Sequence, residues 1–106
     1  METPSSQPLV NHDPASQRFE IRGGAAPAVL DYEWSGAVAV IVHTEVPPEL
    51  RGRGLAEVLV RAALAWAQAE GLKVEPRCTY AAHFIGKHPE FQGLLAPGRG
   101  GPAGHS

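Results

Sequence analysis

The stretch that decides the fold is residues 37–69, which read AVAVIVHTEVPPELRGRGLAEVLVRAALAWAQA. Its first part, residues 37–46, is rich in β-branched residues and predicts a buried central strand. Its last part, residues 55–69, spaces apolar residues by three and four, which predicts a helix with one apolar face. That face comprises Leu55, Val58, Leu59, Ala62, Ala63, Trp66 and Ala69. Between the two elements lies RGRG, residues 51–54, so a glycine-rich turn joins a buried strand to an amphipathic helix.

Two further strands are predicted before this stretch. Residues 18–22 alternate polar and apolar side chains, and residues 28–34 form a second run with strand character. Glycine-containing turns follow each run, at residues 23–24 and 35–36. Short turns of this kind favour an antiparallel meander of three strands.

One more strand and one more helix are predicted after the first helix, which Gly71 is placed to end. Residues 73–78 form a short strand in which Pro76 cannot donate a ladder hydrogen bond. Thr79 is placed to cap a second helix, which must end before Pro89. The order β-β-β-α-β-α with one crossover predicts an α+β fold, with a mostly antiparallel sheet and a β-α-β-α C-terminal half.

Length and composition confine this fold to one domain. The chain has 106 residues, of which 12 are glycine and 10 are proline. Many of these lie near the two ends, in segments that have few apolar residues to bury. We therefore predict a disordered leader over residues 1–16, a domain over residues 17–95 and a disordered tail over residues 96–106.

Charge and cysteine content argue against several classes of function. The formal net charge of −2 gives no general attraction to nucleic acid or anionic lipid, and no apolar run is long enough to cross a membrane. The single cysteine excludes an internal disulfide framework. Five histidines without an i, i+4 pair or a carboxylate cluster predict no metal site. We expect a soluble cytoplasmic protein with no nucleic-acid or membrane partner.

The turn at residues 51–54 is a candidate anion site. Glycines at a strand-to-helix turn can leave backbone N–H groups free at a helix N-terminus, where the helix dipole also favours negative charge. Arg51 and Arg53 add local positive charge. The alternative interpretation is that the glycines only permit a tight turn and the arginines only keep it soluble. The spacing does not match the phosphate loops of P-loop or Rossmann proteins.

The same turn resembles the acetyl-coenzyme A loop of the GNAT superfamily of N-acetyltransferases, whose pattern is V-x-P-x-x-[RQ]-G-x-G-x-[GA]. The residues that fill this pattern in register are Val46, Pro48, Arg51, Gly52, Gly54 and Ala56. The resemblance continues downstream through Cys78, Ala81, Phe84, Ile85 and Phe91. It spans roughly residues 17–95 and implies a minimal GNAT-like fold of the very short, single-domain branch.

Two departures from the family pattern concern catalysis. Cys78 stands where GNAT proteins usually carry an asparagine, and Ile85 stands where they often carry the tyrosine that protonates the departing thiolate. The branch also lacks the early helices from which larger relatives build acceptor pockets.

The resemblance implies acetyl-coenzyme A as co-substrate. Backbone N–H groups of residues 51–56 would hold its pyrophosphate, and the strand edge at residues 44–46 would pair with its pantetheine amides. The residues implied to contact it are Thr44, Glu45, Val46, Arg51, Gly52, Arg53, Gly54, Leu55, Ala56, Cys78 and Phe84.

Three residues are candidates for the chemistry, with a structural alternative for each. His43 is the best base by intrinsic pKa, because imidazole titrates near neutrality; alternatively it is a structural histidine. Glu45 shares a strand face with His43 and is a second candidate base or its orienting partner; alternatively it is a solvated strand end. Cys78 precedes a predicted helix and is a candidate nucleophile; alternatively it is a small buried residue.

These features predict an acetyl-coenzyme A-dependent N-acetyltransferase acting on an amine of a small molecule or polypeptide. The alternative is a non-catalytic module that binds acyl-coenzyme A in a regulatory or interaction role. We expect a monomer or a weak homodimer, because a small domain with an exposed sheet edge can pair with itself.

Overall fold

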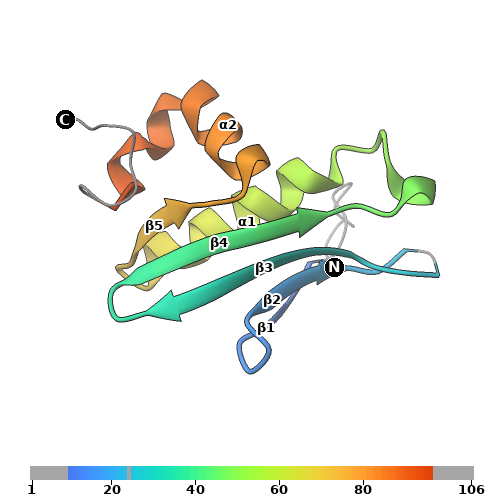
Figure 1. Cartoon of the computed structure of the whole chain (residues 1–106), viewed down its shortest axis with the longest axis horizontal. Helices are drawn as coiled ribbons and strands as arrows, with labels where there is room; N and C mark the ends of the chain where they lie inside the picture. The colour runs from blue at the N-terminus through green and yellow to red at the C-terminus, as the bar shows by residue number, and fades with distance from the viewer. Residues whose placement is uncertain (1–9, 24, 97–106) are drawn as a thin grey trace, which may run out of the picture.

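Five strands form one sheet whose spatial order follows the chain, β1-β2-β3-β4-β5. The computed structural model describes residues 10–23 and 25–96 (Figure 1). Neighbouring strands are antiparallel, except that β4 and β5 are parallel. The strands are β1 (Asn11–Asp13), β2 (Arg18–Ile21), β3 (Ala28–Ser35), β4 (Val38–Glu45) and β5 (Lys73–Pro76).

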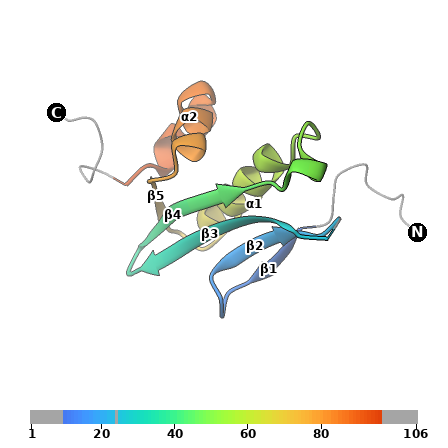
Figure 2. The same cartoon turned by 45° about the vertical axis from the view of Figure 1, so that its right-hand side comes forward.

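Within the described residues, two helices and two short 3₁₀ helices complete the fold. A parallel pair of strands needs a crossover connection, which here is α1 (Leu55–Ala69). Helix α2 (Thr79–Lys87) follows β5, and the 3₁₀ helices are η1 (Pro48–Leu50) and η2 (Pro89–Leu94). Helix α1 runs along one face of the sheet, and both views leave the opposite face open (Figures 1 and 2). The predicted α+β class, with a mostly antiparallel sheet and a β-α-β-α C-terminal half, is confirmed.

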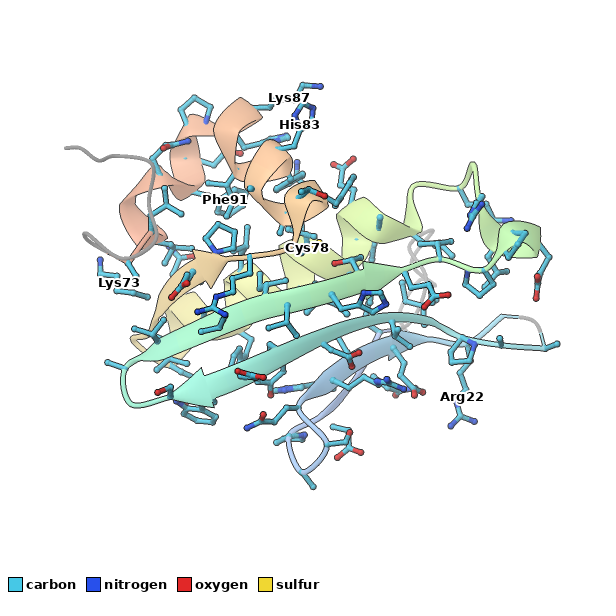
Figure 3. All side chains as sticks on the ribbon, in the orientation of Figure 1. Arg22, Lys73, Cys78, His83, Lys87 and Phe91 are labelled. Carbon is cyan, nitrogen blue, oxygen red and sulfur yellow. The ribbon has the colours of Figure 1, made fainter. Side chains whose placement is uncertain are left out.

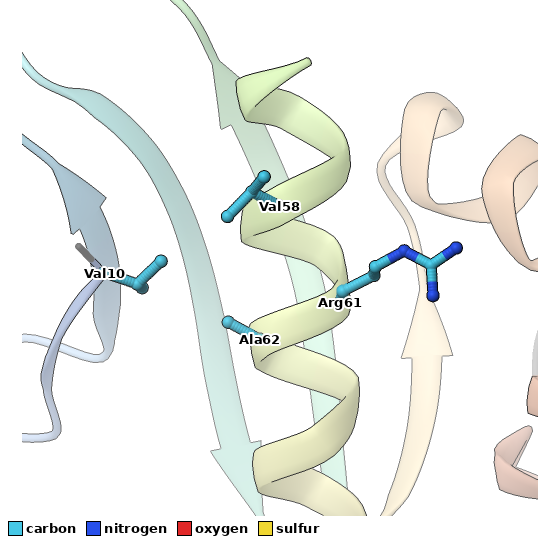
Figure 4. A pocket seen from close by; sticks show the side chains of 4 residues that line it. All are labelled: Val10, Val58, Arg61 and Ala62. Atoms are coloured by element: carbon cyan, nitrogen blue, oxygen red, sulfur yellow. The ribbon is translucent and has the colours of Figure 1, made fainter. Parts of the chain in front are cut away.

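The core lies between α1 and the sheet. Leu59, Val60 and Leu64 of α1 are completely buried. They pack with alternate residues of the strands, such as Leu30 and Ile41, because successive side chains of a strand point to opposite faces. A shallow hollow remains between the start of β1 and α1, where the side chains of Val10, Val58 and Ala62 lie (Figure 4). Within residues 10–23 and 25–96, neither helix has the length and apolar character needed to cross a bilayer.

Strand β1 was not predicted, because residues 11–13 fall in the segment expected to be a disordered leader. The sequence of β1, NHD, carries no apolar alternation, and its pairing with β2 places His12 opposite Phe19. The prediction of disorder is therefore wrong for residues 11–13, whereas residues 1–9 lie outside the described residues. Composition did not predict this strand, because the imidazole of His12 rather than an apolar pattern packs it against the domain.

The last strand and the C-terminal segment also differ from expectation. Strand β5 ends at Pro76 rather than at Cys78, because the N–H groups of Arg77 and Cys78 both turn to the Ile41 carbonyl. Ala96, expected to begin the disordered tail, donates its N–H to the Val74 carbonyl at 2.9 Å. The rest of the predicted tail, residues 97–106, lies outside the described residues.

His12 joins β1 to the aromatic part of the core. Its ring stacks on Phe19 with centroids 4.1 Å apart and meets the edge of Trp66 at 5.1 Å. Its Nε2 lies 2.6 Å from the Tyr32 hydroxyl. Burial lowers the pKa of His12 from its ordinary value, although the charges of Asp13 and Glu70 partly oppose the shift.

We expect this environment to make stability fall in mild acid. The pKa of His12 is lower in the folded than in the unfolded chain, so the unfolded chain takes up the proton first as the pH drops through 6.5. The free energy of unfolding should therefore decrease from about pH 7.5 to about pH 5.5. In His12→Gln, the free energy of unfolding should decrease less across the same interval. Urea unfolding followed by tryptophan fluorescence measures both. Equal pH dependence in the two proteins would contradict this expectation, and His83→Gln, at an exposed position of α2, is the matched control.

Candidate functional site: the gap between β4 and β5

The candidate site is a gap that opens between β4 and β5. Their paired registers end at Ile41 opposite Pro76, and the Ile41 carbonyl then accepts the N–H groups of both Arg77 and Cys78. Beyond this point β4 continues to Glu45, while the segment that follows β5 turns away into α2. Pro76 has no N–H to lose where the strands part. Among the residues that the structure describes, the edge of β4 over residues 42–45 therefore has no strand partner on its β5 side.

An irregularity in β4 at the same level shifts the alternation of its side chains between the two faces of the sheet. The register with β3 shifts between Asp31 and Tyr32, which pair with His43 and Ile41, so Val42 is an extra residue in β4. After this bulge, His43 and Glu45 lie on the open face of the sheet, and Thr44 lies on the face toward the helices. Without the extra residue, His43 would follow Ile41 onto the face toward the helices, so the bulge is what turns His43 to the open face.

Cys78 and Thr44 meet across the gap. Cys78 is the N-cap residue of α2 and lies at the foot of that helix, beside β4 (Figure 3). Its thiol donates to the Thr44 hydroxyl, with Sγ and Oγ1 3.4 Å apart. The side chain of Cys78 is half-buried. These two predicted residues therefore line the same, helix-side part of the gap.

His43 and Glu45 form the second pair of predicted residues. The Nε2 of His43 lies 3.2 Å from Oε1 of Glu45, and the two side chains are 52% and 63% exposed. Both are accessible to an acceptor that approaches the open face. Among the described residues, no hydrogen bond joins this pair to Cys78 or Thr44. The candidate catalytic residues therefore fall on the two sides of β4 rather than in one cluster.

The glycine-rich turn lies at the end of the gap, where β4 leads into α1. Gly52 and Gly54 have φ values of 84° and 73°, a left-handed conformation that favours glycine. Gly54 is the N-cap of α1, and no side chain in the described ranges caps the helix. The turn is tied back to β4, because the guanidinium Nε of Arg51 donates to the Val46 carbonyl at 2.9 Å.

Backbone N–H groups remain available at this turn. That of Arg51, expected among the phosphate donors, is instead used within η1, where it donates to the Pro48 carbonyl. In the described part of the chain, the N–H groups of residues 52–56 have no protein acceptor, and the first bond into the helix runs from Val58 to Gly54. Free donors at a helix N-terminus suit a phosphate or another anion. Residues 51–54 are all exposed, and Leu55 contributes only backbone because its side chain is buried.

Phe84, predicted to contact the coenzyme, lies in the core and is 4% exposed. One side of its ring stacks on His88 at a centroid distance of 4.0 Å, and the guanidinium of Arg61 lies 5.2 Å from the ring centroid. Arg61 extends from α1 toward α2 (Figure 4). In this packing Phe84 joins the two helices.

The open face also contains an ion pair that the sequence patterns did not single out. Arg18 binds Asp31 with two hydrogen bonds, Nε to Oδ1 at 2.6 Å and Nη2 to Oδ2 at 3.2 Å. Asp31 pairs in register with both Arg18 on β2 and His43 on β4. Alternating polar positions in the predicted strands were the available signal, but the strand register was needed to bring the three residues into one row. Within the described ranges, no group of three His, Cys, Asp or Glu residues is arranged to hold a metal ion.

Comparison with known proteins agrees with this architecture. A family model described as GCN5-related N-acetyl-transferase matches residues 18–94. The chain is 39% identical over 89 residues to Protein NATD1 of Xenopus tropicalis, covering 81% of this chain and 82% of that protein. It is 40% identical over 83 residues to human Protein NATD1, covering 76% of this chain and 74% of the other.

A solved structure shares the fold. A Staphylococcus aureus protein described as GCN5-like, determined in solution by NMR, superposes with a TM-score of 0.69 at 24% sequence identity. The match covers 95% of this chain and all of the other. The fold and the gap define an acetyltransferase-type domain, with an unpaired strand edge leading to a helix N-terminus. The chain belongs to the GCN5-related N-acetyltransferase family.

Proposed function

We propose that this protein is an acetyl-coenzyme A-dependent N-acetyltransferase. The observation that carries the proposal is the continuity of the gap with the glycine-rich turn. An unpaired strand edge suits an extended amide-containing chain, and free N–H groups at a helix N-terminus suit a pyrophosphate. Acetyl-coenzyme A combines these two chemical features, with its thioester at the end of the extended arm.

The residues of the gap fit this co-substrate. The N–H groups of residues 52–56 would bind the pyrophosphate, and Arg53 would add positive charge. Thr44, Glu45 and Val46 form the edge along which the pantetheine arm would lie. Because the Val46 carbonyl already accepts from Arg51, pairing with the arm would rest on the other polar groups of this edge. Cys78 and Thr44 would then flank the thioester from the helix side.

His43 is the proposed base on the open face. It takes a proton from the ammonium of the acceptor, and the free amine attacks the thioester carbonyl to form the amide bond. The carbon–sulfur bond breaks, and the coenzyme A thiolate leaves and takes up the second proton, which the attacking nitrogen loses as the amide forms. Glu45 holds the imidazole in place through the 3.2 Å contact. We favour direct transfer over an acetyl-Cys78 intermediate, because the contact partner of the thiol is a hydroxyl rather than a base.

The second candidate function is an acyl-coenzyme A-binding module without useful catalysis. Ile85 favours this alternative, since it stands where a tyrosine acid is expected and is a 1% exposed core residue. No proton for the departing thiolate can come from that position. Turnover of acetyl-coenzyme A with a panel of small and peptidyl amines separates the functions, because a binding module would retain affinity without turnover.

The first test is coenzyme binding with a variant of the turn. Gly54→Val should weaken acetyl-coenzyme A binding at least about tenfold, because a β-branched residue resists the left-handed conformation and displaces the adjacent N–H groups. Gly36→Val is the matched control. Gly36 also has a positive φ, 60°, with no atom within 4 Å of an added Cβ, but it lies in the β3–β4 turn away from the gap.

Titration calorimetry measures both variants against the parent protein. The control should bind acetyl-coenzyme A as the parent does, although it bears a similar backbone strain. Equal weakening in both variants would assign the effect to global destabilisation, and absence of binding in the parent protein would overturn the proposal.

A further inference from the structure

The open face of the sheet carries rows of charged side chains across its strands. Cross-strand registers join Glu20, Val29 and Glu45 in one row, Arg18, Asp31 and His43 in the next, and Glu33, Val40 and Glu75 in a third. In the two outer rows, Glu20 and Glu75 are paired with arginines that follow their own strands, Arg22 at 3.3 Å and Arg77 at 2.9 Å. The row of His43 is the one in which a cation, Arg18, stands opposite carboxylates of neighbouring strands, Asp13 on β1 and Asp31 on β3.

Asp31 lies between Arg18 and His43. Its carboxylate is 26% exposed and is engaged by both the Nε and Nη2 atoms of Arg18. This hydrogen bond and the charge of Asp31 raise the pKa of Arg18, so the guanidinium stays charged throughout the working range. Side chains directly opposite on antiparallel strands have Cβ atoms only about 5 Å apart, so the charge of Asp31 acts at close range on His43.

Without Arg18, Asp31 would present an uncompensated negative charge beside His43. A carboxylate beside an imidazole favours its protonated form. A protonated imidazole cannot accept the proton of an acceptor ammonium. The charged groups of the face around His43 are Asp13 on β1, Arg18, Glu20 and Arg22 on and after β2, Asp31 and Glu33 on β3, Glu45 on β4, and Glu75 and Arg77 on and after β5.

We propose that Arg18 is a positioning residue that neutralises Asp31 and so keeps His43 free to act as the base. Arg18 touches neither co-substrate nor acceptor in this role, and it acts through the carboxylate that lies between it and His43. The inference rests on the proposed acetyltransferase function for its catalytic meaning. The electrostatic part concerns the protein alone.

The charge of Arg18 is removed in Arg18→Met, which retains much of the unbranched side chain. The acidic limb of the kcat/KM profile should move to higher pH by about 0.3 unit, the effect of one unit charge removed two strands away, at about 10 Å, in a water-like dielectric. The double variant Arg18→Met with Asp31→Asn should return the limb to its parental position, because both charges are then gone. Arg18→Lys, which keeps the charge, should move it much less.

Arg22→Met is the matched control. Arg22 pairs with Glu20 at 3.3 Å and projects from the sheet beyond the end of β2, outside the row of His43 (Figure 3). Its loss should leave the limb unmoved. An unmoved limb in Arg18→Met, an equal movement in Arg22→Met, or no restoration in the double variant would each overturn the inference.

Proton NMR titration of the His43 ring in the free protein repeats the comparison without any acceptor. The titration midpoint should shift upward in Arg18→Met and return in the double variant. If the parent protein turned over no amine but this pattern appeared, the proposed function would fail while the electrostatic role of Arg18 stood. If the midpoint did not move, the role of Arg18 would fail whatever the activity.

Discussion

Replacing His43 with glutamine is expected to lower kcat/KM for acetyl transfer by about 100-fold, the lower end of what a positioned general base contributes. Glutamine is polar and of comparable reach, but it cannot take a proton from an ammonium group at neutral pH. The side chain is 52% exposed on the open face, so its replacement removes little packing. Acetyl-coenzyme A affinity should stay within about twofold of the parent value, because the imidazole lies on the other side of β4 from Cys78 and Thr44.

The matched control is His88→Gln, which replaces a histidine that packs on Phe84 and bonds its carbonyl, away from the gap. This control should lose stability rather than turnover per folded molecule. The assay follows coenzyme A release with a thiol reagent, alongside calorimetry for affinity. A His43→Gln protein with parental kcat/KM would remove His43 from the mechanism and leave Glu45 as the candidate base.

Cys78 gives the companion measurement that distinguishes the two routes. Direct transfer predicts that Cys78→Ala retains kcat/KM to within about tenfold, because the thiol only lines the gap. Transfer through Cys78 predicts a much larger loss and an acetyl group on the intact protein after incubation with acetyl-coenzyme A. Mass spectrometry of the protein before an amine is added detects that group.

Local sequence patterns were sufficient for the parts of the fold that bury apolar residues regularly. The run at residues 37–46 and the helical spacing at residues 55–69 correspond to β4 and α1, and the glycine-rich turn joins them as expected. Strand β1 has no such pattern. Its attachment depends on His12 meeting Phe19, Tyr32 and Trp66, which are far apart in sequence.

The candidate site was predicted residue by residue but not in its geometry. Sequence could place His43 and Glu45 on one strand face, and the structure puts their side chains in contact. It could not reveal that the extra residue Val42 turns His43 away from the face of Ile41 and onto the open face. The Arg18–Asp31 pair was missed for the same reason, because cross-strand register depends on turns and bulges rather than on local composition.

Leu59→Ala is expected to lower the free energy of unfolding by about 3–4 kcal/mol, because the burial of the deleted side-chain atoms is lost and a cavity is left behind. Leu59 lies on α1 and is completely buried in the core between that helix and the sheet. Alanine has the highest helix propensity, so the loss cannot come from the helix backbone. For a domain stable by about 5–15 kcal/mol, this is a large fraction of the total.

Urea unfolding followed by tryptophan fluorescence measures this loss, with Gln68→Ala as the control at an exposed position of the same helix. The control should stay within about 0.5 kcal/mol of the parent protein.

Ligand binding should restore part of the stability that Leu59→Ala loses, because the turn that would bind the coenzyme lies at the N-terminus of α1. Acetyl-coenzyme A at about 100 times its Kd should return about 2.7 kcal/mol to Leu59→Ala. A destabilised variant that acetyl-coenzyme A failed to stabilise, although the parent protein bound it, would mean that docking of α1 on the sheet and the coenzyme turn are coupled, with the turn lost when the core loosens. Equal stabilisation of variant and parent would show that the turn keeps its geometry while the core beneath it is weakened.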